Sequence, residues 1–517
     1  MRIGRSEFPV CNRKWYFIEM MATMINFITQ IGEKLPTVLW VLVILYAAIT
    51  GGFLVLENKS PSKTMAWLLA FLSLPFVGVA LYLFFGREYR PFSRENKLLT
   101  QELGNRLTAS PDVTAFLAQQ PQEIAKLKAA NPLVYDRVLE LMDRNLDAPL
   151  FPRNTLEVLK NATEKYPRLL ADLKVATHSI HMEYFEWGSD GVMQEFKEVL
   201  IEKAREGVEV RVIYDPLGCF WMLSRKYVNE MNAGGVKMLA WSSLYAIHTI
   251  SYRSHRKIVV IDGKIGYTGG LNLSEEHLEG PHGGKFSGWR DTHVRVTGQV
   301  VLGLQASFAV QWYNTTKEEL LDPAYYPLVE EEHPYLPLQI AHSGADAEWK
   351  AIRSVYFGLI TAAQHQIYIQ SPFFILDAGL AEALAGAARS GVEVHIMLAP
   401  SGPGINAPYQ AALTYAANMA EAGVRIYFYH GAYFHAKTIS VDSMICSIGS
   451  TNMDIRSFAI NYELNLIVYD RETTQKLDQL FCNDLNHCTE FDLEAYKHSN
   501  IAWRVRDSIM RLFSPLL

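Results

Sequence analysis

Two stretches near the amino terminus are almost wholly apolar and carry no charged residue. They run from Leu35 to Leu56 and from Met65 to Phe85. At a rise of about 1.5 Å per residue, each helix would be about 30 Å long, which matches the hydrocarbon core of a bilayer. The pattern therefore predicts a transmembrane helical hairpin over residues 35–86, in preference to a pair of buried helices in a soluble protein.

Basic residues are denser at the outer ends of this hairpin than in the loop between its spans. A lysine precedes the first span and four basic residues follow the second within residues 87–97, whereas the loop carries two lysines. By the positive-inside tendency, both ends and everything after residue 86 should face the cytoplasm. Residues 1–34 form a leader, which is either an interfacial helix or an extension upstream of the natural start.

Beyond the hairpin, short apolar strands alternate with helical segments, and the pattern occurs twice. GVEVRVIYDPLG begins at Gly207 and GVEVHIMLAPSG begins at Gly391, and each follows a helix-like segment. This alternation favours an α/β fold with mixed, largely parallel sheets flanked by helices. The duplication predicts two pseudo-twofold-related lobes over residues 161–330 and 331–500. We expect a helical linker over residues 87–160 and a carboxy-terminal amphipathic helix over residues 501–517.

Each predicted lobe contains the same chemical pattern, His-x-Lys-x-x-x-x-Asp, followed by a small-residue turn that ends in asparagine. The two copies are His255, Lys257, Asp262 and Asn272, and His435, Lys437, Asp442 and Asn452. Because side chains alternate along a strand, the histidine and lysine of each copy lie on one face. Equal spacing from histidine to asparagine in both copies argues against coincidence. We expect the two copies to meet around a single phosphate.

Such a site suits phosphodiester chemistry. Protonated lysines would neutralise the phosphate charge. One imidazole must be neutral to attack phosphorus and form a phosphohistidine, while the other must be protonated to supply the leaving alcohol with a proton. Asp291 and Glu463 follow the asparagine turns at comparable places, where a carboxylate would orient each histidine; a structural salt bridge is the alternative. Asp262 and Asp442 suit a role in strand-to-turn geometry better than contact with substrate.

Composition narrows the functional classes for this chain of 517 residues. A net charge of -6 and a pI of about 6.2 oppose bulk nucleic-acid binding through a basic surface. The five cysteines have no C-x-x-C spacing, which indicates reduced thiols in a cytosol-facing body. No P-loop, dinucleotide fingerprint or H-E-x-x-H motif occurs, so we expect neither a cofactor nor a catalytic metal.

These residues and their flanks resemble the phospholipase D superfamily and, within it, the bacterial cardiolipin synthases. The resemblance covers nearly all of residues 35–517. It rests on the hairpin ending in LYLFFGREYR, on RSHRKIVVIDG, FHAKTISVD and GSTNMDIRSFAINYE, and on the terminal RLFSPLL. It implies that the histidine, lysine and aspartate of both motifs are catalytic positions.

The resemblance also implies roles for residues outside the two motifs. Asn272, Asn452 and Ser450 would contact the substrate phosphate. Asp291 and Glu463 would orient the histidines. The first copy has glycine where the second has Ser450, an asymmetry that is common in the family.

The implied reaction moves a phosphatidyl group from one phosphatidylglycerol to another, giving cardiolipin and glycerol through a phosphohistidine. The implied setting is a bacterial inner membrane, with phospholipid substrates and no nucleic acid, and the oligomeric state stays open. The residues leave open which histidine is the nucleophile, although the resemblance favours the first. The alternatives are a membrane-bound phospholipase D that uses water and forms phosphatidic acid, and a phosphatidyltransferase that uses another alcohol. A nuclease is disfavoured, and a non-enzymatic scaffold would tolerate loss of either histidine.

Overall fold

The computed structural model describes most of the chain in two compact units, residues 1–88 and 89–517. The described residues are 37–57, 61–73, 78, 82, 111–130, 132–146, 148–242, 252–280, 286–327, 333–344, 350–402 and 406–514. The leader predicted over residues 1–34 lies outside them.

The first unit contains two helices, α2 (Thr37–Leu56) and α3 (Pro61–Ser73), which contact one another. Leu54 and Phe71 are buried there, and the ring of Tyr82 packs edge-on against Phe71. Residues 35–86, predicted as a transmembrane hairpin, fall partly outside the described residues. Among the residues that are described, no helix combines the length and the apolarity needed to cross a membrane.

A single 15-stranded sheet organises the second unit, in the order β19-β13-β12-β10-β15-β16-β18-β9-β1-β8-β6-β5-β2-β3-β4. The strands of the first half are β1 (Phe151–Lys160), β2 (Ser179–Tyr184), β3 (Glu209–Tyr214), β4 (Lys237–Ala240), β5 (Ile258–Ile261), β6 (Ile265–Gly269) and β8 (Thr292–Gly298). Those of the second half are β9 (Tyr335–Ser343), β10 (Gln366–Ser371), β12 (Glu393–Leu398), β13 (Arg425–Tyr429), β15 (Thr438–Val441), β16 (Ile445–Gly449), β18 (Glu463–Val468) and β19 (Cys488–Glu490).

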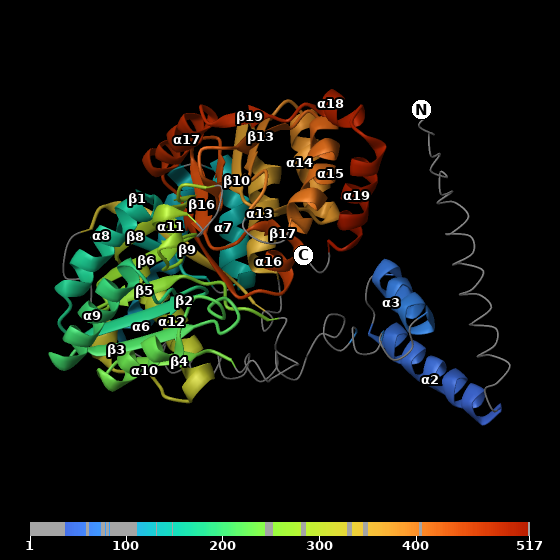
Figure 1. Cartoon of the computed structure of the whole chain (residues 1–517). Coiled ribbons are helices and arrows are strands. Elements are labelled where there is room, and N and C mark those ends of the chain that lie inside the picture. Colours follow the sequence, from blue (N-terminus) through green and yellow to red (C-terminus); the bar gives the residue numbers. More distant parts are fainter. Residues whose placement is uncertain are drawn as a thin grey trace, which may run out of the picture. The chain divides into compact units, whose positions relative to one another are not determined.

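The strand order is the same in the two halves when it is read outward from the central pair β1 and β9, with β19 added at one edge. This repetition agrees with the predicted pseudo-twofold lobes, which lie side by side in Figure 1, the first in green and the second in orange to red. The two lobes share one continuous sheet. β1 lies in the stretch predicted as a helical linker, so the sheet of the first lobe begins before residue 161.

The prediction of largely parallel sheets is wrong. In the 15-stranded sheet the parallel pairs are β2 to β3 to β4 and β10 to β12 to β13. The pairs toward the centre are antiparallel, and so is the edge pair of β13 with β19. For β5 with β6 and for β15 with β16, the cause is the short turn after each motif strand. Only three residues separate β5 from β6, and three separate β15 from β16. A connection this short can only reverse the chain, because a parallel crossover needs a dozen residues or more.

Helices cover both faces of the sheet. In the first lobe they are α8 (Asn161–Lys174), α9 (Val192–Arg205), α10 (Arg225–Ala233) and α12 (Val300–Thr316). Their counterparts in the second lobe are α13 (Ala351–Ala362), α14 (Ala378–Arg389), α15 (Ala407–Glu421) and α17 (Arg471–Leu485). Two further helices, α6 (Pro111–Ala130) and α7 (Pro132–Leu146), precede the sheet, and α7 packs on α13. Apolar clusters fill the space between these helices and the strands.

The predicted carboxy-terminal helix is present as α19 (Ile501–Leu512) and packs against α15. Asp507 is buried, and Tyr415 Oη donates a hydrogen bond to Ser514 Oγ at 3.1 Å. Ile501 and Trp503 remain exposed on its outer side. The helix therefore docks on the second lobe through part of its surface and leaves several large apolar side chains exposed.

Candidate active site

The two motif histidines are held by carboxylates that come from the opposite lobe. His255 Nδ1 lies 3.0 Å from both carboxylate oxygens of Glu463. His435 Nδ1 lies 2.8 Å from Asp291 Oδ2. Both carboxylates are completely buried. Each carboxylate fixes Nδ1 as the protonated ring nitrogen and leaves Nε2 of the same ring as the nitrogen that can react.

Backbone pairing between the lobes produces this exchange. The short strand β14 (Tyr433–Phe434), which leads into His435, pairs in parallel with β7 (Trp289–Arg290), which leads into Asp291. The segment before His255 repeats this arrangement, because Ser254 forms a bridge with Tyr462. The amides of His255 and His435 donate hydrogen bonds to the carbonyls of Tyr462 and Arg290, at 2.9 and 2.8 Å. The lobe interface thus sets both histidine–carboxylate pairs through main-chain contacts.

Lys257 and Lys437 lie at the centre of the same cluster and are almost completely buried. Each ammonium donates a hydrogen bond to the carbonyl of the histidine two residues before it. Burial, opposed by the carboxylate of Glu463 and assisted by the charge of Lys437, lowers the pKa of Lys257 to about 7. Burial lowers the pKa of Lys437 to about 8, opposed by Asp291. Two cations packed this closely make a site that favours an anion.

Burial also lowers the pKa of both histidines. For His255 the burial is opposed by the carboxylate of Glu463. For His435 the pKa lies well below its usual range, because burial and the charges of Lys437 and Lys257 act in the same direction. The neutral form of each ring is therefore favoured until an anion enters the site. A phosphate placed between the lysines would counter their repulsion and raise the histidine pKa values.

The asparagines that close the two turns lie beside this cluster. Asn272 Nδ2 donates a hydrogen bond to Glu186 Oε2 at 2.6 Å, and its side chain is buried. Asn452 is buried too, and its Oδ1 has no hydrogen-bond partner among the described residues. Burial raises the pKa of Glu186, and the positive charge of Lys257 is the largest effect that opposes this rise. Sequence reasoning missed Glu186, although a carboxylate just after the repeated strand was a signal that could have revealed it.

The glycine–serine asymmetry between the two turns has a steric cause. Ser450 Oγ donates a hydrogen bond to Glu463 Oε2 at 2.5 Å. A Cβ atom added at Gly270, the equivalent position, would lie 2.1 Å from Asp291 Oδ1. Aspartate brings its carboxylate one methylene closer to the backbone than glutamate does. The residue paired with aspartate must therefore lack a side chain, whereas the one paired with glutamate can carry a hydroxyl.

The motif aspartates lie at the far ends of β5 and β15, away from the histidines. Asp262 accepts hydrogen bonds from the backbone amides of residues 177, 178 and 179 at 2.7–2.9 Å. Asp442 does the same for the amides of residues 364, 365 and 366. Both have positive φ, 52° and 53°. This geometry places each carboxylate at a turn, where it holds the start of the neighbouring strand.

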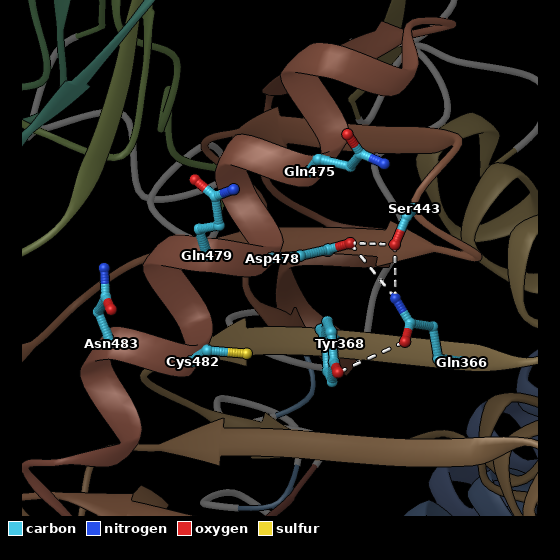
Figure 2. Close-up of a pocket in the computed structure, with 8 residues that line it drawn as sticks. All are labelled: Gln366, Tyr368, Ser443, Gln475, Asp478, Gln479, Cys482 and Asn483. Carbon is cyan, nitrogen blue, oxygen red and sulfur yellow. Dashed lines mark hydrogen bonds between the residues drawn. The ribbon is translucent and has the colours of Figure 1, made fainter.

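A separate hollow of about 620 Å³ lies between α17, the strand β10 and the turn that follows β15 (Figure 2). Gln366 Nε2 and Ser443 Oγ both hydrogen-bond to Asp478 Oδ2 there. None of the residues that line it belongs to the histidine cluster. In the described part of the chain, no group of three or more His, Cys, Asp or Glu side chains is arranged to hold a metal ion.

Comparisons with known proteins agree with the duplication. A family model described as "Cardiolipin synthase, PLD-like domain" matches residues 169–282 and 356–485. A second model, described as "Phospholipase_D-nuclease N-terminal", matches residues 38–87. The two matches to the first model fall in the two lobes.

Curated relatives cover most of the chain. The cardiolipin synthase of Geobacillus kaustophilus (strain HTA426) is 38% identical over 471 residues, which are 89% of this chain and 90% of the relative. Cardiolipin synthase 2 of Bacillus anthracis is 36% identical over 480 residues, 91% of this chain and 90% of the relative. Among solved structures, the phosphatidylserine synthase of Haemophilus influenzae Rd KW20 matches with a TM-score of 0.55 and 13% identity, covering 74% of this chain and 98% of that chain. The last likeness shows a shared fold.

Proposed function

The chain belongs to the cardiolipin synthase family of phospholipase D-like phosphatidyltransferases, and from this premise we propose that its two histidines divide the chemistry of one transfer between two phosphatidylglycerol molecules. The observation that carries the proposal is the pair of crosswise contacts, His255 with Glu463 and His435 with Asp291. These contacts hold both imidazoles by Nδ1, with Nε2 available, beside two buried lysines.

In the first step, Nε2 of a neutral histidine attacks phosphorus and the bond to the leaving glycerol breaks. We assign this nucleophile to His255, following the resemblance of the first motif to the family. His435, protonated when the anionic substrate enters, gives its proton to the glycerol oxygen. Lys257 and Lys437 offset the charge on the phosphoryl oxygens, and Asn272 and Asn452 contact them. The product of this step is a phosphatidyl-histidine and free glycerol.

In the second step, His435 removes a proton from a glycerol hydroxyl of the second phosphatidylglycerol. That oxygen attacks phosphorus, the phosphorus–nitrogen bond breaks, and cardiolipin leaves with His255 neutral again. Each histidine returns to its starting protonation state, so no external acid or base is consumed. Water in place of the second lipid would give phosphatidic acid, which is the competing hydrolytic function.

Purified protein supplied with phosphatidylglycerol tests this function. We expect cardiolipin and glycerol in equal amounts, and near-complete loss of both with His255→Ala or His435→Ala. His430→Ala is the matched control, because His430 is exposed and contacts Thr489 outside the site. If phosphatidic acid were the main product, the protein would be a hydrolase and the proposed synthesis would be refuted. Peptide mapping after an alkaline quench, which preserves the phosphorus–nitrogen bond and cleaves the acyl esters, should find the phosphoryl group on residue 255. Finding it on residue 435 would reverse the two roles.

We further propose that residues 35–86 form a transmembrane hairpin that tethers the catalytic unit to the cytoplasmic face of a bacterial inner membrane. The apolar sequence and the match of residues 38–87 to the family's amino-terminal model support this placement. A tether would raise the effective concentration of both lipid substrates at the site. We expect the carboxy terminus to resist protease that is added outside intact spheroplasts. Cleavage of the carboxy terminus would contradict a cytoplasmic catalytic unit.

A further inference from the structure

An exposed aromatic loop lies between β3 and α10 in the first lobe. Leu217 is 43% exposed, Phe220 54% and Trp221 92%, and the rings of Phe220 and Trp221 pack edge-on at 4.8 Å. Few side chains of this size are left so open to solvent on a soluble surface. We refer to these three residues as the aromatic lip.

The buried carboxylate of Asp215 holds the backbone of the loop that carries the aromatic lip. Asp215 Oδ1 accepts hydrogen bonds from the amides of Leu217 and Gly218, at 2.8 and 3.2 Å. The same carboxylate accepts from Trp241 Nε1 at 2.7 Å and pairs with Arg253 at 3.2 Å. Arg253 and the next residue lead directly into His255. The loop and the first motif therefore share an anchor.

The loop that carries the aromatic lip also packs against Phe185, which contacts His255 of the candidate active site. A Cβ atom at Gly218 would lie 2.3 Å from the carbonyl oxygen of Phe185, so only glycine allows the loop to approach this closely. The ring of Phe185 packs edge-on against the ring of His255 at 5.0 Å. Lys257 Nζ lies 5.5 Å from the centre of the same ring. One side chain thus separates the loop from the reacting histidine.

The charge beside the aromatic lip suits an anionic lipid surface. Arg225 and Lys226 begin α10 directly after the loop, and both are exposed. Lys226 Nζ forms a 3.8 Å ion pair with Glu230. Aromatic side chains flanked by cations are the arrangement that binds at the headgroup level of an anionic bilayer.

We propose that the aromatic lip inserts into the headgroup region of an anionic bilayer and seats the first lobe so that a lipid phosphate reaches His255. The inference rests on the proposed function, because it assumes that the substrate is drawn from a bilayer. It adds a second membrane contact, made by the catalytic unit itself.

Direct insertion is tested with the full-length protein in proteoliposomes that contain brominated phosphatidylglycerol, which quenches tryptophan at the interface. We expect the tryptophan fluorescence of Trp221→Phe to be quenched less than that of the wild type. We also expect brominated phosphatidylcholine to quench Trp221 less than brominated phosphatidylglycerol does. Trp312→Phe is the control, because Trp312 is completely buried in the first lobe and its loss should leave the quenching by brominated lipid unchanged. Equal quenching of wild type and Trp221→Phe would overturn the proposal. This readout needs no catalysis, so it can fail or succeed independently of the proposed function.

Activity gives the second arm. Phe220→Ser/Trp221→Ser should lower kcat/KM on long-chain phosphatidylglycerol in bilayers by about tenfold or more, while kcat/KM on dispersed short-chain phosphatidylglycerol stays within about twofold. Val175→Ser, at another exposed apolar residue of the first lobe, should leave both values unchanged. Equal losses on the two substrates would mean that the aromatic lip supports the site structurally, and would overturn the membrane role. Absence of cardiolipin from the wild type on either substrate would instead refute the proposed function.

Discussion

Replacing Glu463 by glutamine removes one negative charge and almost no volume, and we expect it to disable His255 in the other lobe. The carboxylate oxygens lie 3.0 Å from His255 Nδ1 and are fully buried. At 3 to 4 Å and an effective dielectric of about 20, a charge pair with the imidazolium that forms during transfer contributes about 4–6 kcal/mol. That loss corresponds to about a 10³–10⁴-fold lower kcat. The amide still accepts the hydrogen bond from Ser450, so the fold should survive.

The assay is cardiolipin formation by the purified variant, with Asp172→Asn as a control. Asp172 is another buried carboxylate, and it pairs with Arg295 outside the site, so its loss should affect stability more than kcat. Side-chain ¹⁵N NMR should show a changed tautomer signal for His255 and an unchanged one for His435. A decrease in kcat of less than about tenfold would refute the electrostatic argument. A changed signal for His435 alone would refute the crosswise assignment.

Three other outcomes are expected. Gly270→Ser should abolish activity, measured as cardiolipin formation, because its Cβ would lie 2.1 Å from Asp291 Oδ1; wild-type turnover would contradict the steric explanation. Inhibition by tungstate should weaken as the pH rises from 6 to 9, because Lys257 and Lys437, with pKa values of about 7 and about 8, lose the protons that attract the anion; a constant inhibition constant would refute this. Asp262→Asn should lower the free energy of unfolding by about 1–3 kcal/mol in denaturant titration and leave kcat of the folded enzyme nearly unchanged, whereas a selective loss of kcat would give this carboxylate a chemical role.

The same two lysines affect stability in the opposite direction. Their folded pKa values lie below the ordinary value of 10.5, so between about pH 7 and 10.5 the unfolded chain binds more protons than the folded one. Stability from this source therefore increases as the pH rises through that window, while anion binding decreases. The protein keeps two buried cations near neutrality at a cost in folding free energy.

The sequence allowed prediction of the α/β class, the duplication and the residues that meet in one cluster, because each depends on a local pattern. Alternation along a strand places His255 and Lys257 on one face without knowledge of the fold. The sequence did not reveal which carboxylate serves which histidine, since Glu463 lies 208 residues from His255 and the contact depends on how the lobes pair. Strand direction was mispredicted because valine-rich strands look alike in parallel and antiparallel pairs. Phe185 and Glu186 occur in only one copy of the repeat, so the duplication does not mark them.

Because each histidine borrows its carboxylate from across the interface, neither half of the molecule holds a complete working unit. A lobe expressed alone would keep its imidazole and lysine but lose the group that fixes the ring. Such a fragment could regain competence only beside a partner turned through half a revolution, as in a symmetric dimer. Joining two such halves in one polypeptide permits differences that identical subunits cannot have. One half can pair a glycine with aspartate and the other a serine with glutamate, and the two histidines can take different roles.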